Sequence, residues 1–201
     1  MLKFIIFDWD GTLNDSMESV YKAYSVHSGK SLDYIRKNFD PDWKAFIKKE
    51  NIPKMTFEMW NEFMEKFGTE FFPGAAECIK KLKKDGFILT IASSSPLYDI
   101  KKKLSEENLL DSFGTLITND MVEKLKPDPE CLIAVLKKLN AKAEDCVFVG
   151  DACVDAIAAS RIGMKFIGVS WGFQNREELE QVESIKIVND FDELYNLIKS
   201  L

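Results

Sequence analysis

Short apolar runs recur along this chain, and polar residues directly follow most of them. The clearest runs span residues 2–7, 87–92, 147–149 and 166–169, with a weaker one at residues 116–117. Their near-continuous hydrophobicity is typical of strands buried on both faces, as in a parallel sheet. Helical patterns lie between the runs, at residues 75–84, 97–107, 129–139 and 155–162. The alternation predicts an α/β fold with a Rossmann-like, doubly wound parallel sheet.

Residues 16–72 interrupt this alternation. They contain no strand-like run, and their aromatic and apolar side chains fall at spacings of three and four, as on helices. We therefore expect an α/β core formed by residues 1–15 and 73–201, and a small inserted all-α cap formed by residues 16–72. A short edge segment at residues 185–188 and a last helix at residues 191–198 would complete the core.

Chemistry-bearing side chains follow the predicted strands. In an open parallel sheet, ligands bind beyond the carboxyl ends of the strands. Asp8 and Asp10 follow the first run, and Gly11 comes next and lets the backbone turn sharply. The other polar side chains at strand ends or ahead of a helix are Ser93, Ser94, Lys126, Asp151 and Asp155. We expect all of these groups at one edge of the sheet.

Four carboxylates crowded at one edge would repel one another strongly unless a cation lay among them. Because the candidate ligands are all oxygens, with no His or Cys among them, they favour Mg²⁺ over Zn²⁺. Lys126 and the donors of Ser93 and Ser94 would suit a phosphate-like anion. Each motif alone is typical of an ordinary turn or helix start, but together they predict metal-assisted phosphoryl transfer.

The motifs together resemble those of the haloacid dehalogenase superfamily, in the group with a helical cap inserted soon after the first motif. FDWDGTLNDS resembles the first motif, IASS the second, LKPDP the third and VGDACVD the fourth. The stretch AASRIGMKFIGVSWG is similar to phosphoglycolate phosphatase-like members. The resemblance spans nearly the whole chain. Trp9, which is bulkier than usual, and Ser instead of Thr in the second motif depart from the pattern.

The resemblance implies that two aspartates carry the reaction. Asp8 would attack phosphorus and form a transient aspartyl-phosphate. Asp10 would protonate the leaving oxygen and then take a proton from the attacking water. The resemblance also implies that dehalogenases carry another residue at the position of Asp10, which favours phosphoryl chemistry here.

The resemblance assigns the remaining polar residues to binding. Ser93 and Lys126 would hold the phosphate and act in catalysis, and Gly11 and Ser94 would line the same phosphate site. Asp155 would lie behind them and orient Lys126 or a metal-bound water. The Mg²⁺ ligands would be Asp8, Asp10 and Asp151.

A magnesium-dependent phosphomonoesterase acting on a small phosphorylated metabolite is the predicted function. Phosphoglycolate, a sugar phosphate or a nucleoside monophosphate would be a suitable substrate. A beta-phosphoglucomutase-type enzyme would use the same residues but pass the phosphoryl group to a sugar hydroxyl. A non-catalytic phosphate-binding module on the same fold is the other alternative.

Substrate specificity is expected to come from the cap, between about residues 27 and 54. The polar and aromatic residues there that could face the cleft are His27, Arg36, Trp43, Lys44 and Lys48. Helical aromatic spacing more often reflects packing than binding, so the sequence does not select among them.

Charge and hydropathy exclude other classes of function. The net charge of −6 argues against a nucleic-acid partner, which would need a basic face. No apolar stretch approaches the 20 or so residues of a membrane span, and the first residues do not resemble a signal peptide. We expect a cytoplasmic protein, monomeric or homodimeric, with no membrane partner.

Overall fold

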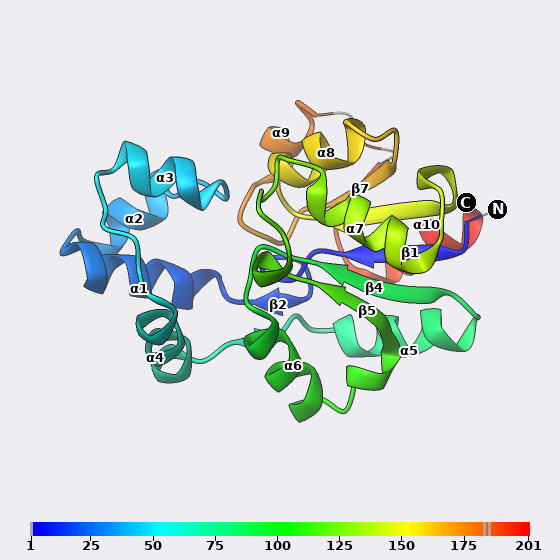
Figure 1. The fold of residues 1–201 in the computed structure, drawn as a ribbon, viewed down its shortest axis with the longest axis horizontal. Coiled ribbons are helices and arrows are strands. Elements are labelled where there is room, and N and C mark those ends of the chain that lie inside the picture. Colours follow the sequence, from blue (N-terminus) through cyan, green and yellow to red (C-terminus); the bar gives the residue numbers. More distant parts are fainter. Residues whose placement is uncertain (1, 183, 185) are drawn as a thin grey trace.

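A parallel sheet forms the centre of the larger part of this computed structural model, which describes residues 2–182, 184 and 186–201 (Figure 1). Its six described strands are, in spatial order, β5 (Phe113–Ile117), β4 (Ile88–Ala92), β1 (Phe4–Phe7), β6 (Cys146–Gly150), β7 (Lys165–Val169) and β8 (Lys186–Val188). All neighbours run parallel. The predicted fold class is confirmed. Ile185, the first residue of the predicted edge segment, lies outside the described residues.

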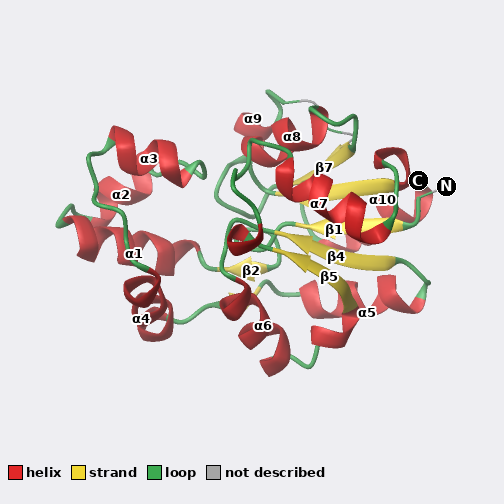
Figure 2. Cartoon of the chain, in the orientation of Figure 1, coloured by secondary structure: helices red, strands yellow, loops and turns green. Residues whose placement is uncertain are grey.

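Helices cover both faces of the sheet, as the buried strands require (Figure 2). Side chains of β1 alternate between the two faces: Ile5 and Phe7 pack with one core cluster, and Phe4 and Ile6 with the other. The first face is covered by α5 (Ala75–Lys84), α6 (Leu97–Glu106) and α10 (Phe191–Ser200). The second is covered by α7 (Glu130–Leu139) and α8 (Cys153–Ser160).

Short helical turns complete this part of the chain. They are α9 (Arg176–Leu179) and the 3-10 turns Leu110–Ser112, Asn119–Met121 and Ala143–Asp145. Most elements lie within two or three residues of their predicted bounds. The segment Asn119–Met121 leaves the carboxyl end of β5 and leads toward Lys126, so it belongs to the rim of the candidate site.

A separate helical unit lies at one end of the molecule, opposite the two chain termini (Figure 1). It consists of α1 (Met17–Ser28), α2 (Leu32–Asn38), α3 (Trp43–Lys49) and α4 (Phe57–Phe67), and we call it the cap. The cap has its own buried cluster, made of Val20, Tyr24, Ile35, Phe46 and Ile52. The predicted inserted helical module is present.

A short two-stranded ladder marks the junction between the core and the cap. β2 (Asn14–Asp15) pairs antiparallel with β3 (Glu70–Phe71), where the chain leaves and re-enters the core. A two-residue ladder is too short to leave an alternating hydrophobic pattern in the sequence. The division into residues 1–15 with 73–201 and residues 16–72 stays a prediction.

The described helices are short. The longest of those in the described ranges, α1, has 12 residues, whereas a membrane span needs about 20 apolar ones. None of them is long and apolar enough to cross a bilayer. The cytoplasmic location stays a prediction.

Candidate active site

The strand order places a crevice beside β1. The chain passes from β1 outward through β4 and β5, and then crosses to β6, β7 and β8 on the other side. Loops that follow strands on opposite sides of such a reversal diverge, which opens a crevice at the carboxyl end of the sheet. Asp8 follows β1 there, and its N–H donates to the carbonyl of Val149 in β6 at 2.8 Å. The first aspartate is thus fixed by a main-chain bond.

A buried lysine joins two of the predicted carboxylates. The Lys126 Nζ lies 2.7 Å from Asp8 Oδ1 and 2.7 Å from Asp155 Oδ1. All three side chains are almost fully buried. Asp155 is the third residue of α8, and its other oxygen accepts from the N–H of Ala152 at 3.1 Å. The expected contact between Asp155 and Lys126 is therefore observed.

Asp151 is held from two sides. Its Oδ1 accepts from the hydroxyl of Thr12 at 3.1 Å, and its Oδ2 accepts from the N–H of Phe173 at 2.7 Å. Two glycines give it room: a Cβ on Gly11 or on Gly172 would lie 2.3 Å from Asp151 Oδ2. Gly11 also has φ +76°, a conformation that glycine adopts readily. The packing fixes Asp151 between the first motif and the loop after β7.

The buried charges at this site do not balance. Carboxylate oxygens of Asp8, Asp151 and Asp155 lie within 4.8 Å of one another, and one lysine faces them. Burial raises the pKa of Asp8 to about 7, with the attraction of Lys126 opposing and repulsion from Asp155 adding to it. Burial, followed by repulsion from Asp155 and Asp8, also raises the pKa of Asp151 well above its usual range. A bound cation would relieve this excess negative charge.

Lys126 itself is held in its charged form. Burial lowers the pKa of its ammonium group, but the attraction of Asp155 and Asp8 outweighs burial and the net shift is upward. The Nζ also lies 5.5 Å from the ring centroid of Phe148, on the buried side. Lys126 is therefore a fixed positive charge at the bottom of the crevice.

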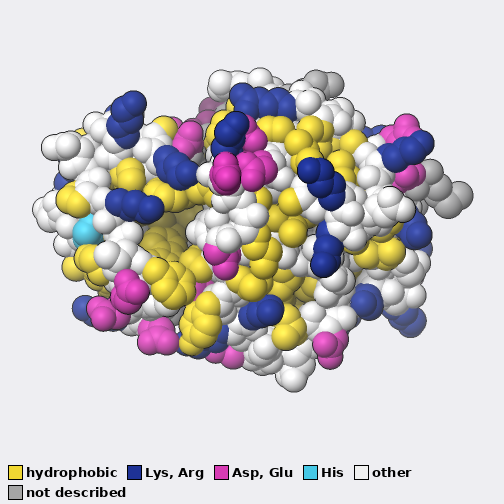
Figure 3. Space-filling model, viewed as in Figure 1, with side chains coloured by type: hydrophobic (Ala, Val, Ile, Leu, Met, Phe, Trp, Pro, Cys, Tyr) yellow, Lys and Arg dark blue, Asp and Glu magenta, His cyan; other side chains and the backbone are white. Residues whose placement is uncertain are grey.

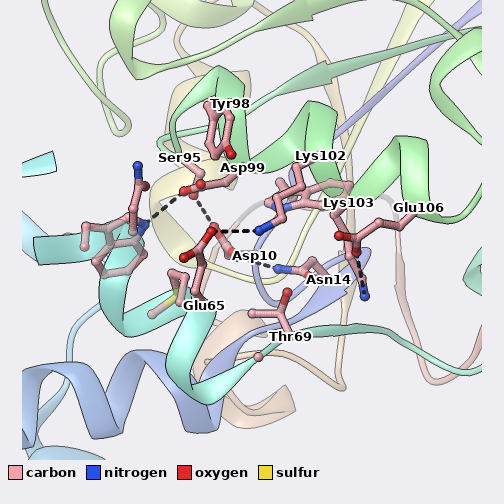
Figure 4. A pocket seen from close by; sticks show the side chains of 15 residues that line it. Asp10, Asn14, Glu65, Thr69, Ser95, Tyr98, Asp99, Lys102, Lys103 and Glu106 are labelled. Atoms are coloured by element: carbon pink, nitrogen blue, oxygen red, sulfur yellow. Dashed lines mark hydrogen bonds and ion pairs between the residues drawn. The ribbon is translucent and has the colours of Figure 1, made fainter. Parts of the chain in front are cut away.

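The Asp10 side chain lies apart from this cluster. Its Oδ1 accepts from the Asn14 amide at 3.0 Å, and its Oδ2 accepts from the hydroxyl of Ser95 (Figure 4). Asp10 lines two cavities, the large one described below and a smaller one of about 230 Å³ on the side of α6. Its carboxylate is not among those that converge within 4.8 Å. Asp10 could join them only by a rotamer change or through its main-chain carbonyl.

The smaller cavity lies where the cap meets α6 (Figure 4). The indole N–H of Trp60 in α4 donates to Asp99 Oδ2 at 3.2 Å, and Lys102 pairs with Glu65 at 3.0 Å. Burial raises the pKa of Asp99 to about 6. These contacts tie the cap to the core directly beside Asp10.

The predicted phosphate-binding residues are brought to the same crevice. Ser93 is buried; its N–H donates to the carbonyl of Ile117 in the sheet, and its Oγ accepts from the N–H of Ser95. Its hydroxyl proton has no acceptor among the described residues, so it could be donated to a ligand. Ser94 lines the large cavity. The Gly11 N–H already donates to the carbonyl of Asn14. The absence of a side chain on Gly11 leaves room for the Asp151 carboxylate. The individual binding roles stay predictions.

A cavity of about 870 Å³ extends from these groups to the cap. Figure 3 shows this hollow between the cap and the core, with hydrophobic side chains inside it and basic side chains near one edge. Of the five predicted cap candidates, Trp43 and Lys44 line it. The other three do not: His27 contacts the carbonyl of Pro53 at 2.8 Å, Arg36 pairs with Glu18 at 2.8 Å, and Lys48 is exposed elsewhere.

Several residues of the site were missed at the sequence level. Thr12 lies inside the first motif and could have been assigned from its hydroxyl. Asn14, which holds Asp10, also lies inside the first motif, and Ser95, which holds Asp10 from the other side, directly follows the second. The main chain of Phe173, which holds Asp151, carries no such signal. Only the fold brings them to the two aspartates.

Comparisons with known proteins agree with this geometry. The family described as haloacid dehalogenase-like hydrolase matches residues 5–169. "Probable phosphatase IndB" of Dickeya dadantii is 29% identical, covering 100% of this chain and 95% of that protein. A phosphoglycolate phosphatase of Psychrobacter arcticus is 25% identical, covering 96% and 94%. The crystal structure of "a predicted phosphatase from Clostridium acetobutylicum" is 27% identical, covers 100% of both chains and has a TM-score of 0.86.

These findings confirm the resemblance inferred from the motifs. They also confirm the enzyme class, a hydrolase of the haloacid dehalogenase superfamily whose named relatives are phosphatases.

Proposed function

Because the chain belongs to the haloacid dehalogenase-like hydrolases, we propose that it is a Mg²⁺-dependent phosphatase that acts through an aspartyl-phosphate on Asp8. The observation that carries the proposal is the buried cluster of Asp8, Asp151, Asp155 and Lys126 at the carboxyl ends of β1 and β6. The phosphatase names of its relatives support the reaction class. The partner is a small phosphorylated metabolite.

The donor set fits a hard divalent cation. Asp8 and Asp151 offer carboxylate oxygens close to one another, and neither His nor Cys belongs to the cluster among the described residues. Oxygen-only sites suit Mg²⁺. We propose that Asp8 and Asp151 hold the ion through their carboxylates and Asp10 through its main-chain carbonyl, with Asp155 engaged by Lys126. When bound, Mg²⁺ supplies positive charge that offsets the negative charge of the carboxylates and of a phosphoryl group.

The nucleophile would be the carboxylate of Asp8. An anion attacks a phosphoryl group only if their charges are screened, and Lys126, 2.7 Å from Asp8, is a buried cation placed for that purpose. Asp155 holds Lys126 from the other side, so the ammonium group stays beside Asp8. The hydroxyl of Ser93 would donate to a phosphoryl oxygen. The product of this step is an aspartyl-phosphate on Asp8.

Proton transfer would fall to Asp10. Its carboxylate, held by Asn14 and Ser95, lines the same cavity as Asp8 but lies outside the carboxylate cluster. It can therefore give a proton to the leaving oxygen in the first half-reaction. In the second it takes a proton from the water that attacks the aspartyl-phosphate.

The direct test is phosphate release from a panel of phosphomonoesters, with Mg²⁺ and with EDTA, followed by acid quench to trap phosphorylated enzyme. We expect release with Mg²⁺, loss with EDTA, and a hydroxylamine-sensitive phosphoryl group that is absent in Asp8→Asn. A bisphosphate product would indicate the phosphomutase alternative instead. Phosphate binding without turnover of any substrate would favour the non-catalytic module.

A further inference from the structure

Three aromatic side chains line the large cavity without belonging to a hydrophobic core. Trp43, Phe57 and Tyr98 all contribute to its wall. None of them is a member of the three hydrophobic clusters found among the described residues, or is packed against one. Phe57 is 49% exposed and Tyr98 is 55% exposed. Since folding does not account for these rings, an apolar surface is left in place for a ligand.

The three rings, which we call the aromatic rim, come from both sides of the crevice. Trp43 and Phe57 are the first residues of α3 and α4, and Tyr98 is the second residue of α6. The two cap helices have fixed starts, since Asp42 accepts from the N–H of Ala45 at 3.0 Å and Thr56 from that of Met59 at 3.3 Å. All three rings therefore lie in the first turn of a helix, at its amino-terminal end.

Charge separates the two ends of the cavity. At the core end lie the carboxylates, the serines and the buried Lys126, which suit a phosphoryl group. On the cap side, the charged residues among the described lining are Lys44 and Lys54, both exposed at the edge. A short acid such as a two-carbon carboxylate would need a buried cation or donor near the phosphate for its second charge. The cap wall offers rings there instead.

The size of the cavity points the same way. About 870 Å³ lies in the range of pockets that enclose a ligand of drug-like size, about 300–1,000 Å³. A two-carbon phosphate ester would leave most of that volume as water against apolar rings. A leaving group that carries a flat ring would displace this water and pack against the rim.

We propose that the substrates are phosphomonoesters whose leaving group carries a flat unsaturated ring, held by Trp43, Phe57 and Tyr98. This inference rests on the proposed phosphatase function. The shared chemistry is a ring linked to an alkyl phosphate ester, as in an arylmethyl phosphate or a nucleoside monophosphate. The rim contributes binding energy equally before and at the transition state, so it acts on KM more than on kcat.

The first experiment compares turnover of naphthylmethyl phosphate and adenosine monophosphate with that of phosphoglycolate, since all three are esters of alcohols and differ little in leaving-group ability. We expect the kcat/KM of at least one ring-bearing substrate to exceed that of phosphoglycolate by about 10-fold, the factor expected from one well-packed aromatic contact. A preference for naphthylmethyl phosphate would mean that the rim binds the ring alone. A preference for adenosine monophosphate would mean that it binds a ring carried on a sugar. Equal or higher kcat/KM for phosphoglycolate would overturn the proposal.

A pair of cap variants tests the rim itself. Phe57→Ala removes an exposed ring that lines the cavity, whereas Tyr34→Ala removes a ring of similar exposure, 41%, that does not line it. We expect Phe57→Ala to raise KM for the preferred ring-bearing substrate about 3- to 10-fold with kcat little changed. Tyr34→Ala should change neither. Equal effects of the two variants would count against the rim.

Binding of a phosphonate separates this inference from the proposed function. Naphthylmethylphosphonate keeps the ring and the anion but has no ester bond to hydrolyse, and methylphosphonate lacks the ring. Calorimetry on the wild-type chain with Mg²⁺ should show at least about 10-fold tighter binding of the first. Ring-dependent binding without any phosphatase activity would refute the function alone. Phosphatase activity with equal binding of the two phosphonates would refute the aromatic rim alone.

Discussion

The two walls of the large cavity differ in which side chains they present and in how far these are buried. On the core wall, the charged groups at the end of β1 are buried and fixed by one another, as Lys126 is by Asp8 and Asp155. On the cap wall, Phe57 is 49% exposed and belongs to none of the three hydrophobic clusters found among the described residues. Burial strengthens interactions between charges, so leaving a buried charge without an opposite charge lowers stability strongly. Substituting an exposed aromatic residue changes stability little. We therefore expect the core wall to set the chemistry and the cap wall to determine which substrate binds.

The largest expected effect comes from the core wall. Asp8→Asn keeps the shape of the side chain but removes the attacking carboxylate, so we expect phosphate release to fall by at least about 10⁴-fold. Stability should not fall in parallel, because the change removes one of three crowded carboxylates. Single-turnover assays and thermal unfolding of the same preparation check both points. Substantial residual turnover by a folded variant would show that Asp8 is not the nucleophile.

Removing the buried cation should damage the core wall itself. In Lys126→Met, the three carboxylates lose the ammonium group that faces them, and we expect the free energy of unfolding at pH 8 without Mg²⁺ to drop by about 3–5 kcal/mol. Lys124→Met is the matched control, since Lys124 is 70% exposed and 3.9 Å from Asp128, and it should stay within about 0.5 kcal/mol of the wild type. Urea unfolding measures both. If both variants lost a similar free energy of unfolding, the buried position of Lys126 would not be what makes its charge important for stability.

The cation itself should stabilise the core wall in a pH-dependent way. The pKa of Asp8 is raised from 3.8 to about 7, so its protonated form favours the folded state at low pH. That contribution is lost as the pH rises from about 4 through about 7. Mg²⁺ binds the ionised carboxylates and should reverse this loss, by about 2.7 kcal/mol at 100 times its Kd.

We therefore expect Mg²⁺ to raise the melting temperature more at pH 8 than at pH 5.5. Thermal unfolding with Mg²⁺ or EDTA at the two pH values measures the difference, and Asp151→Asn serves as the variant with a weakened site. An equal gain at both pH values would mean that Mg²⁺ does not compete with protons at this cluster.

The smallest effect is expected where the two walls meet. Trp60→Phe keeps most of the ring but removes the donor to Asp99, and we expect the free energy of unfolding to fall by about 1 kcal/mol. Asp99→Asn retains an acceptor oxygen for the indole, so it should change stability less. Urea unfolding of both variants measures the difference. A larger loss in Asp99→Asn would indicate that the Asp99 charge, and not the hydrogen bond, joins the cap to the core.

Much of the catalytic side was predictable because its signals are local. Asp8 and Asp10 directly follow an apolar strand, and Asp151 follows another, so strand pattern and residue type together located them. That Asp8 and Asp155 meet Lys126 at one edge of the sheet also agrees with the general rule that parallel strands present their carboxyl ends at the same edge. The cap was harder: Trp43 was correctly among the candidates, but His27, Arg36 and Lys48 were equally plausible at helical spacing.

By itself, the sequence determined the α/β class, the inserted helical segment and the strand-end carboxylates, because each depends on a short-range pattern. Only the tertiary structure decided which groups touch. It joins Thr12 and Phe173 to Asp151 across 139 and 22 residues of sequence, and it turns the Asp10 carboxylate toward Asn14 and Ser95. It also leaves Phe57 and Tyr98 exposed on facing walls. Such contacts depend on how distant segments pack, and no local periodicity in the sequence encodes that arrangement.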